Sequence, residues 1–163
     1  MKLLISDANI FIDMHVSGLT RLMFKLPEEF AVPNVLYEEE LREYHPDLPG
    51  YGLRILDINQ EYMDEAYSLG ETYKHPSHND LLALALAKQE ACPLLSGDGK
   101  LREAAENEQV EVRGTIWLMG RLLEEGVITV EQAEQAYDIM KQEGRRLPWP
   151  ETKKQINHYK KQQ

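Results

Sequence analysis

Short apolar runs alternate along the chain with longer segments in which apolar residues recur every three or four positions. The short runs predict buried strands, and the longer periodicity predicts amphipathic helices. Strands are predicted at residues 2–6, 30–32, 53–58, 93–96 and 110–112. Helical segments are predicted at residues 10–16, 20–26, 34–44, 61–73, 79–91, 101–107, 115–125 and 130–142. Residues 45–52 contain two prolines and two glycines and are predicted to form a loop.

Strands that alternate with helices are typical of an α/β domain with a largely parallel sheet and helices on both faces. The 163 residues fit one such domain. We assign residues 1–146 to this domain and residues 147–163 to a basic C-terminal tail that is either flexible or docks. Deletion of this tail is expected to leave folding intact.

Composition narrows the class of protein. Apolar residues make up 42 % of the chain, enough for a core, and no apolar run approaches the ~18 residues that a membrane span needs. The apolar run at the start ends at Ser6, too early for an export signal. Cys92 is the only cysteine, so no internal disulfide can form and no zinc pattern is present. These features predict a cytoplasmic protein without a membrane segment.

Charge is distributed unevenly. The net charge is −10, yet residues 141–163 hold seven basic and two acidic residues, so they carry +5 and the first 140 residues carry −15. A body this acidic repels a phosphate backbone. Bound divalent cations, a basic partner or the basic tail could each offset that repulsion.

Several acidic residues stand where predicted strands end or helices begin. Asp7 follows the first strand, Asp98 follows the fourth, Asp80 begins the apolar helix at 79–91, and Glu38–Glu40 lie on the helix after the second strand. Ligands of open parallel sheets bind beyond the carboxyl ends of the strands. Carboxylates gathered there suit Mg²⁺ or Mn²⁺, and such ions promote phosphodiester hydrolysis.

Each of these acids also has an ordinary structural explanation. Asp7 can cap the helix that follows it, Asp98 can be a turn residue, and Asp80 can interact with a helix dipole. Two of the three glutamates are expected on a solvated helix face. The joint placement of the acids, rather than any one of them, indicates a metal site.

Four segments in order carry a resemblance to a known family. They are Ile5–Asp13, Val32–Arg42, Ser77–Ala85 and Pro93–Leu101. In these segments the chain resembles the PIN-domain family of metal-dependent ribonucleases, which includes the VapC-type toxins of toxin–antitoxin pairs. The resemblance spans residues 2 to about 125. Residues 112–118 and the helices after them resemble a PIN subgroup that often lacks an obvious toxin role.

The resemblance implies a three-layer α/β/α fold with a central sheet of about five strands. It also implies a catalytic site of four carboxylates that bind Mg²⁺ or Mn²⁺. The matching residues are Asp7, Glu39, Asp80 and Asp98, with Glu40 in place of Glu39 if the register slips by one. Asn9 and Ser96 match supporting residues that orient the carboxylates or the phosphate.

The activity implied is a Mg²⁺- or Mn²⁺-dependent endoribonuclease, with the toxin of a toxin–antitoxin pair as one role. The partners implied are an RNA substrate, an antitoxin protein and a second copy of the chain in a homodimer. The alternative is a catalytically inactive PIN-fold module that binds RNA or protein. A phosphatase of the haloacid-dehalogenase type is disfavoured, because it needs a second Asp where Asn9 stands.

Overall fold

The five predicted strands form one parallel sheet in the computed structural model, in which residues 2–163 are described. The strands are β1 (Leu3–Ser6), β2 (Glu29–Pro33), β3 (Arg54–Leu56), β4 (Leu94–Leu95) and β5 (Val112–Arg113). Their order is β3-β2-β1-β4-β5, and all four pairings are parallel. Central β1 therefore pairs with both β2 and β4, and the chain order reverses between β1 and β4. Ligands of open α/β sheets bind at such a switch point.

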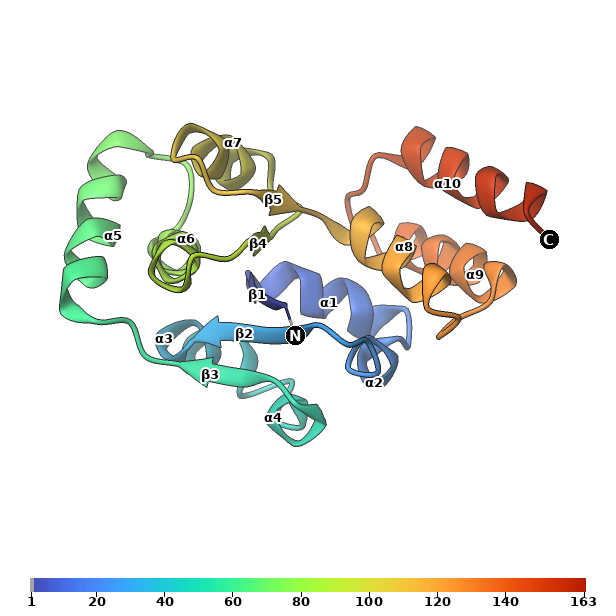
Figure 1. The fold of residues 1–163 in the computed structure, drawn as a ribbon, viewed down its shortest axis with the longest axis horizontal. Helices are drawn as coiled ribbons and strands as arrows, with labels where there is room; N and C mark the ends of the chain where they lie inside the picture. The colour runs from blue at the N-terminus through green and yellow to red at the C-terminus, as the bar shows by residue number, and fades with distance from the viewer. Residues whose placement is uncertain (1) are drawn as a thin grey trace.

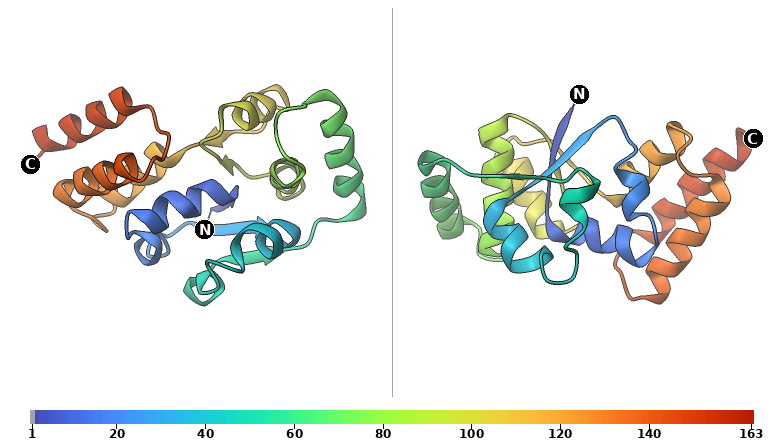
Figure 2. Two further views of the ribbon diagram at one scale, coloured as in Figure 1. Left: turned by 180° about the vertical axis from the view of Figure 1, so that it is seen from behind. Right: turned by 90° about the horizontal axis from the view of Figure 1, so that it is seen from below.

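Helices flank the sheet on both sides, as predicted. The longer helices are α1 (Ala8–Val16), α5 (Gln60–Thr72), α6 (His78–Glu90), α7 (Gly99–Asn107), α8 (Thr115–Glu124), α9 (Val130–Gln142) and α10 (Trp149–Lys161). The short ones are α2 (Thr20–Met23), α3 (Asn34–Leu36) and α4 (Leu48–Tyr51), which lies in the predicted loop. Figures 1 and 2 show α5 and α6 on one side of the strands and α8, α9 and α10 on the other. No helix within residues 2–163 is long and apolar enough to cross a membrane.

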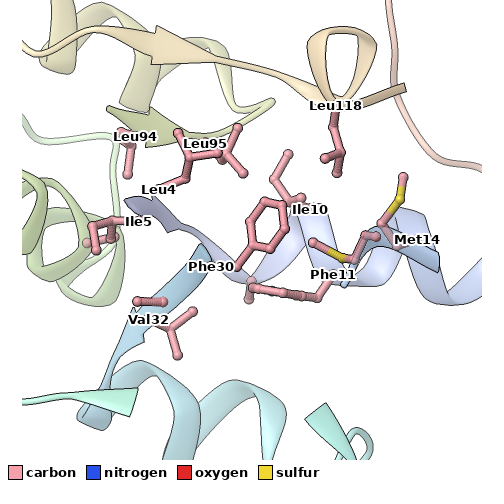
Figure 3. Close-up of a cluster of buried hydrophobic side chains, with 14 of the residues drawn as sticks. Leu4, Ile5, Ile10, Phe11, Met14, Phe30, Val32, Leu94, Leu95 and Leu118 are labelled. Atoms are coloured by element: carbon pink, nitrogen blue, oxygen red, sulfur yellow. The ribbon is translucent and has the colours of Figure 1, made fainter. Parts of the chain in front are cut away.

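The core lies between the sheet and the helices. Helix α6 is buried nearly all round and contacts β1, β2 and β4, which explains why its sequence lacks a polar face. Figure 3 shows the apolar side chains that converge from the central strands, α1 and α8. They include Leu4, Ile5, Ile10, Phe11, Met14, Phe30, Val32, Leu94, Leu95 and Leu118, and all are buried.

The helix predicted over residues 34–44 differs in the structure. Helix α3 is followed by a π-helical turn, η1 (Tyr37–Leu41), and the Arg42 backbone N–H donates to the Tyr37 carbonyl five residues back, at 2.8 Å. A π-helical turn holds more residues than an α-helical turn, and such turns are frequent at functional sites. The three successive glutamates, Glu38–Glu40, lie within this turn.

The C-terminal segment docks on the rest of the domain, which is the second of the two alternatives that the sequence left open. Residues 149–161 form α10, which packs against α8 and α9 and buries Thr152 and Ile156. The Gln155 side chain donates to the Ile116 carbonyl at 2.8 Å and accepts a hydrogen bond from the Tyr137 hydroxyl. Residues at positions 149, 152, 156 and 159 share one face of a helix. The lysines and arginines between and before them obscured this stripe in the sequence.

Removal of residues 147–163 is therefore expected to lower the melting temperature, contrary to the expectation from sequence. Ile156→Ala alone should cost about 2–4 kcal/mol of unfolding free energy, because it empties a buried position between α10 and its neighbours. Chemical denaturation measures this loss. Lys161→Ala, at the exposed end of the same helix, is the matched control and should stay within about 0.5 kcal/mol of the wild type. Equal stability of all the variants would show that the packing of α10 contributes nothing to the free energy of unfolding.

Candidate active site

Asp7 lies at the centre of the carboxyl edge of the sheet, directly after β1, and is fully buried. Its Oδ2 accepts a hydrogen bond from the Ser96 hydroxyl at 2.6 Å, and its Oδ1 accepts one from the Ile10 backbone N–H at 3.3 Å. Burial raises the pKa of Asp7 to about 7 although both hydrogen bonds lower it, and the nearby charges of Asp80 and Asp13 raise it further. The Asp7 carboxylate is therefore a negative charge in need of a counter-charge.

Ser96 joins Asp7 to the loop that follows β4. Its hydroxyl oxygen is buried and accepts a hydrogen bond from the Asp98 backbone N–H at 3.1 Å, while the hydroxyl donates to Asp7. The Asp98 carboxylate caps α7 by accepting from the backbone N–H groups of Lys100 at 2.8 Å and Leu101 at 3.4 Å. The small hydroxyl residue thus fixes Asp7 relative to the loop that carries Asp98.

Asp80 reaches the same edge from the first turn of α6. It forms a capping box with Ser77, in which the Ser77 backbone N–H donates to Asp80 Oδ2 at 3.1 Å and the Asp80 N–H donates to Ser77 Oγ at 3.1 Å. Burial raises the pKa of Asp80, the bonds to Ser77 lower it, and the charge of Asp98 raises it. Because Asp80 also raises the pKa of Asp7, it lies within electrostatic reach of both other aspartates.

Among the glutamates, the structure brings Glu40 to this group. Burial raises the pKa of Glu40, a hydrogen bond with the Asn79 side chain lowers it, and the charges of Asp80 and Glu39 raise it. Its carboxyl group therefore lies beside the start of α6, although much of the residue is exposed. Glu39 is exposed, and no hydrogen bond or ion pair within the described chain ties it to the aspartates. The structure therefore places Glu40, rather than Glu39, within electrostatic reach of Asp80.

The donor set suits a divalent cation, but the ligands are not gathered for one. No three acidic, histidine or cysteine side chains of residues 2–163 are close enough together to hold a metal ion in this arrangement. Each of the three aspartates caps a helix instead. The carboxylate oxygens are nevertheless those that Mg²⁺ and Mn²⁺ prefer, and burial among like charges favours a bound cation. Holding an ion would require the carboxylates to come closer together than they are here.

Comparison with known protein families identifies the family of the chain. A family model described as a PIN domain matches residues 3–161. The chain belongs to the PIN-domain family. PIN domains are generally nucleases that use divalent metal ions, so membership indicates a hydrolase of phosphodiester bonds. The match extends through residue 161, the end of α10, and so covers all three C-terminal helices. No curated protein matches the chain.

Sequence reasoning missed a second polar cluster in this PIN domain, around Asp13. Asp13 is buried on α1, and its two oxygens accept from Thr115 Oγ1 at 2.7 Å and from Arg145 Nε at 2.6 Å. Asn9, expected to orient carboxylates or phosphate, instead contacts Arg145 through its side-chain oxygen, at 3.3 Å. The spacing of Asn9 and Asp13 places them on one face of α1, a signal that was available. Nothing in the sequence linked them to Arg145, which follows α9.

Proposed function

We propose that this PIN domain is a Mg²⁺- or Mn²⁺-dependent endoribonuclease. The observation that carries the proposal is the group formed by Asp7, Ser96 and Asp98, in which one buried hydroxyl contacts both strand-end segments at the switch point of the sheet. Asp80 lies within electrostatic reach of both aspartates, so negative charge accumulates where a phosphodiester and its metal would bind.

In this proposal the four carboxylates bind the ion, and Ser96 positions two of them. Asp7, Asp80, Asp98 and Glu40 would hold the ion. The chemistry that a divalent ion supplies when bound is activation of water and neutralisation of charge at the phosphate. Ser96 keeps Asp7 Oδ2 in place through its short hydrogen bond, and the same hydroxyl fixes the backbone at Asp98. No serine or cysteine nucleophile is required, because the oxygen of a water molecule would bond to the phosphorus while the bond to the 3′-oxygen breaks and that oxygen leaves as a 3′-hydroxyl.

The test is incubation of the full chain with a 5′-labelled single-stranded RNA in Mn²⁺, in Mg²⁺ and in EDTA. We expect internal cuts that leave 5′-phosphate and 3′-hydroxyl ends in either metal and none in EDTA. Binding of the RNA without fragments in either metal would favour the alternative, an inactive PIN-fold binding module. Cleavage that persists in EDTA would contradict the metal-dependent mechanism.

The choice between the two glutamates gives a separate prediction. Glu40→Gln should reduce the cleavage rate at least about tenfold, because it removes a negative ligand beside Asp80. Glu39→Gln makes the same chemical change one residue earlier, on an exposed side chain, and should leave the rate within about twofold. Single-turnover rates at saturating Mn²⁺ measure both. The opposite ranking would place Glu39 in the site.

The family resemblance adds proposals about biological context. We propose a cytoplasmic protein that forms a homodimer, and a toxin role in which an antitoxin protein covers the site. Sedimentation that finds only monomer would contradict the dimer. A small upstream reading frame with a DNA-binding motif, together with growth arrest on expression that Asp7→Asn relieves, would support the toxin role. Growth unaffected by expression of an active nuclease would contradict it.

A further inference from the structure

Four arginines gather beside the loop that carries Asp98, although the body of the protein is strongly acidic. They come from three separate elements: α7, β5 and the link between α9 and α10. The four are Arg102, Arg113, Arg145 and Arg146. Figure 1 shows the α9–α10 link passing beside the junction of β5 and α8. Basic side chains are thus placed where an approaching phosphate backbone would otherwise meet only negative charge.

Two cavities connect these arginines to the candidate active site. The first has a volume of about 400 Å³ and is lined by residues that include Asn9, Asp98 and Arg145. The second has a volume of about 520 Å³ and is lined by Arg102, Arg113 and Trp117, among others. Asp13, Gly97 and Arg146 line both cavities. Because Gly97 directly precedes Asp98, a strand with a phosphate at Asp98 could continue into the second cavity.

The second cavity, which we call the arginine pocket, combines apolar walls with a basic rim. Its apolar lining consists of Val112, Ile116, Trp117, Leu147 and Pro148. The Arg113 guanidinium lies over the Trp117 ring at 4.6 Å from its centroid, although Arg113 also pairs with Glu111. Flat aromatic and guanidinium surfaces of this kind are those on which proteins stack unpaired bases.

The charges of the pocket favour an anionic ligand. Arg102 donates to the Ser96 carbonyl at 3.1 Å, so its positive charge lies next to the serine that contacts Asp7. Arg146 is exposed, and neither it nor Arg102 has an acidic partner within residues 2–163. The acidic residue that lines the pocket, Asp13, already pairs with Arg145. Two positive charges therefore remain available to the ligand.

We infer that the arginine pocket binds one nucleotide of a single-stranded RNA, adjacent to the group of carboxylates that includes Asp98. The base packs against Trp117 and Arg113, and the backbone phosphate is bound by Arg102 and Arg146. The volume of about 520 Å³ is in the usual range for a small-molecule site. This inference rests on the proposed function for the identity of the strand. It explains how an acidic nuclease domain retains its substrate.

RNA binding measured in EDTA tests the pocket without any cleavage. Trp149→Phe leaves Trp117 as the single tryptophan, because the chain contains two. Titration with a 12-nucleotide single-stranded RNA of mixed sequence should give a saturable change in Trp117 emission. Arg146→Gln should weaken the affinity about five- to tenfold and reduce the slope of log K against log salt by about 0.7, since one phosphate contact is lost.

Lys161→Gln is the matched control, because it removes the same charge from an exposed position in the same basic segment. Lys161 lies at the far end of α10, whose 13 residues extend about 20 Å, so the control should bind as the wild type does. Equal weakening by both variants would mean that general charge attraction explains binding, and would overturn the pocket. Binding seen by anisotropy without a change in Trp117 emission would overturn it too.

Three further outcomes distinguish this inference from a protein ligand and from the proposed nuclease activity. Displacement of the RNA by oligoglutamate at similar concentration, with the same Trp117 signal, would indicate an acidic protein segment as the ligand and overturn the assignment to RNA. Arg146-dependent binding in EDTA without cleavage in Mn²⁺ would reject the proposed nuclease and leave the pocket standing. If the protein cleaves RNA and Arg146→Gln leaves its RNA affinity unchanged, the pocket is rejected and the proposed nuclease activity stands.

Discussion

Asp7→Asn is expected to reduce Mn²⁺-dependent cleavage of single-stranded RNA by about 100-fold or more. Asn has nearly the same shape and no charge: its side-chain oxygen can accept from the Ile10 backbone N–H, while its NH2 group, in place of Oδ2, can donate to the Ser96 hydroxyl. Asp7 is the only fully buried acid of the four carboxylates, so no water-exposed group can replace it. A hard cation bound through carboxylates loses much of its affinity with that charge. Single-turnover rates on 5′-labelled RNA measure the loss.

Asp64→Asn is the matched control for this experiment. Asp64 lies on the exposed face of α5 and accepts a hydrogen bond only from Gln60, so the same chemical change should leave the rate unaltered. RNA affinity in EDTA should be the same for the wild type and Asp7→Asn, because Asp7 does not line the arginine pocket. Cleavage by Asp7→Asn at the wild-type rate would indicate either a contaminating nuclease or a different site.

The strands and the central pair of aspartates were predictable because both follow from local patterns. Short apolar runs marked all five strands, and a parallel sheet brings the residues after its strands to one edge. Asp7 and Asp98 follow β1 and β4, which are neighbours in the sheet, so one serine can contact both segments. The family match over residues 3–161 confirms the predicted PIN-domain fold.

Sequence reasoning left Glu39 and Glu40 as alternatives and did not link Arg145 to Asp13, for different physical reasons. Glu38–Glu40 are consecutive polar residues, so hydrophobic periodicity cannot show whether their turn is α- or π-helical. The pairing of Arg145 with Asp13 joins positions 132 residues apart, and it depends on how α9 packs against α1. The stripe of α10 that contains Ile156 was obscured by the charge of residues 141–163, which suggested a solvated tail.

The buried charge of Asp7 should also make the stability of the protein depend on pH, and Asp7→Asn should remove that dependence. The pKa of Asp7 is raised from 3.8 to about 7 in the folded protein. Between these values the folded state binds more protons than the unfolded state, so the free energy of unfolding falls as pH rises. The full loss from this group is about 4 kcal/mol above pH 7, at about 1.4 kcal/mol per unit.

Asp7→Asn should therefore be more stable than the wild type at pH 8, by up to about 4 kcal/mol, and equally stable near pH 4, where Asp7 is protonated in both states. Denaturation at the two pH values measures the difference, and Asp64→Asn should follow the wild-type profile throughout.

A cation that binds the Asp7 carboxylate offsets its buried charge and stabilises the folded state by mass action. Millimolar Mn²⁺ at pH 8 should accordingly raise the melting temperature of the wild type and leave that of Asp7→Asn unchanged. Parallel pH profiles for the two proteins would show that the buried charge of Asp7 does not destabilise the fold. Equal stabilisation of both proteins by Mn²⁺ would show that the metal does not bind the Asp7 carboxylate.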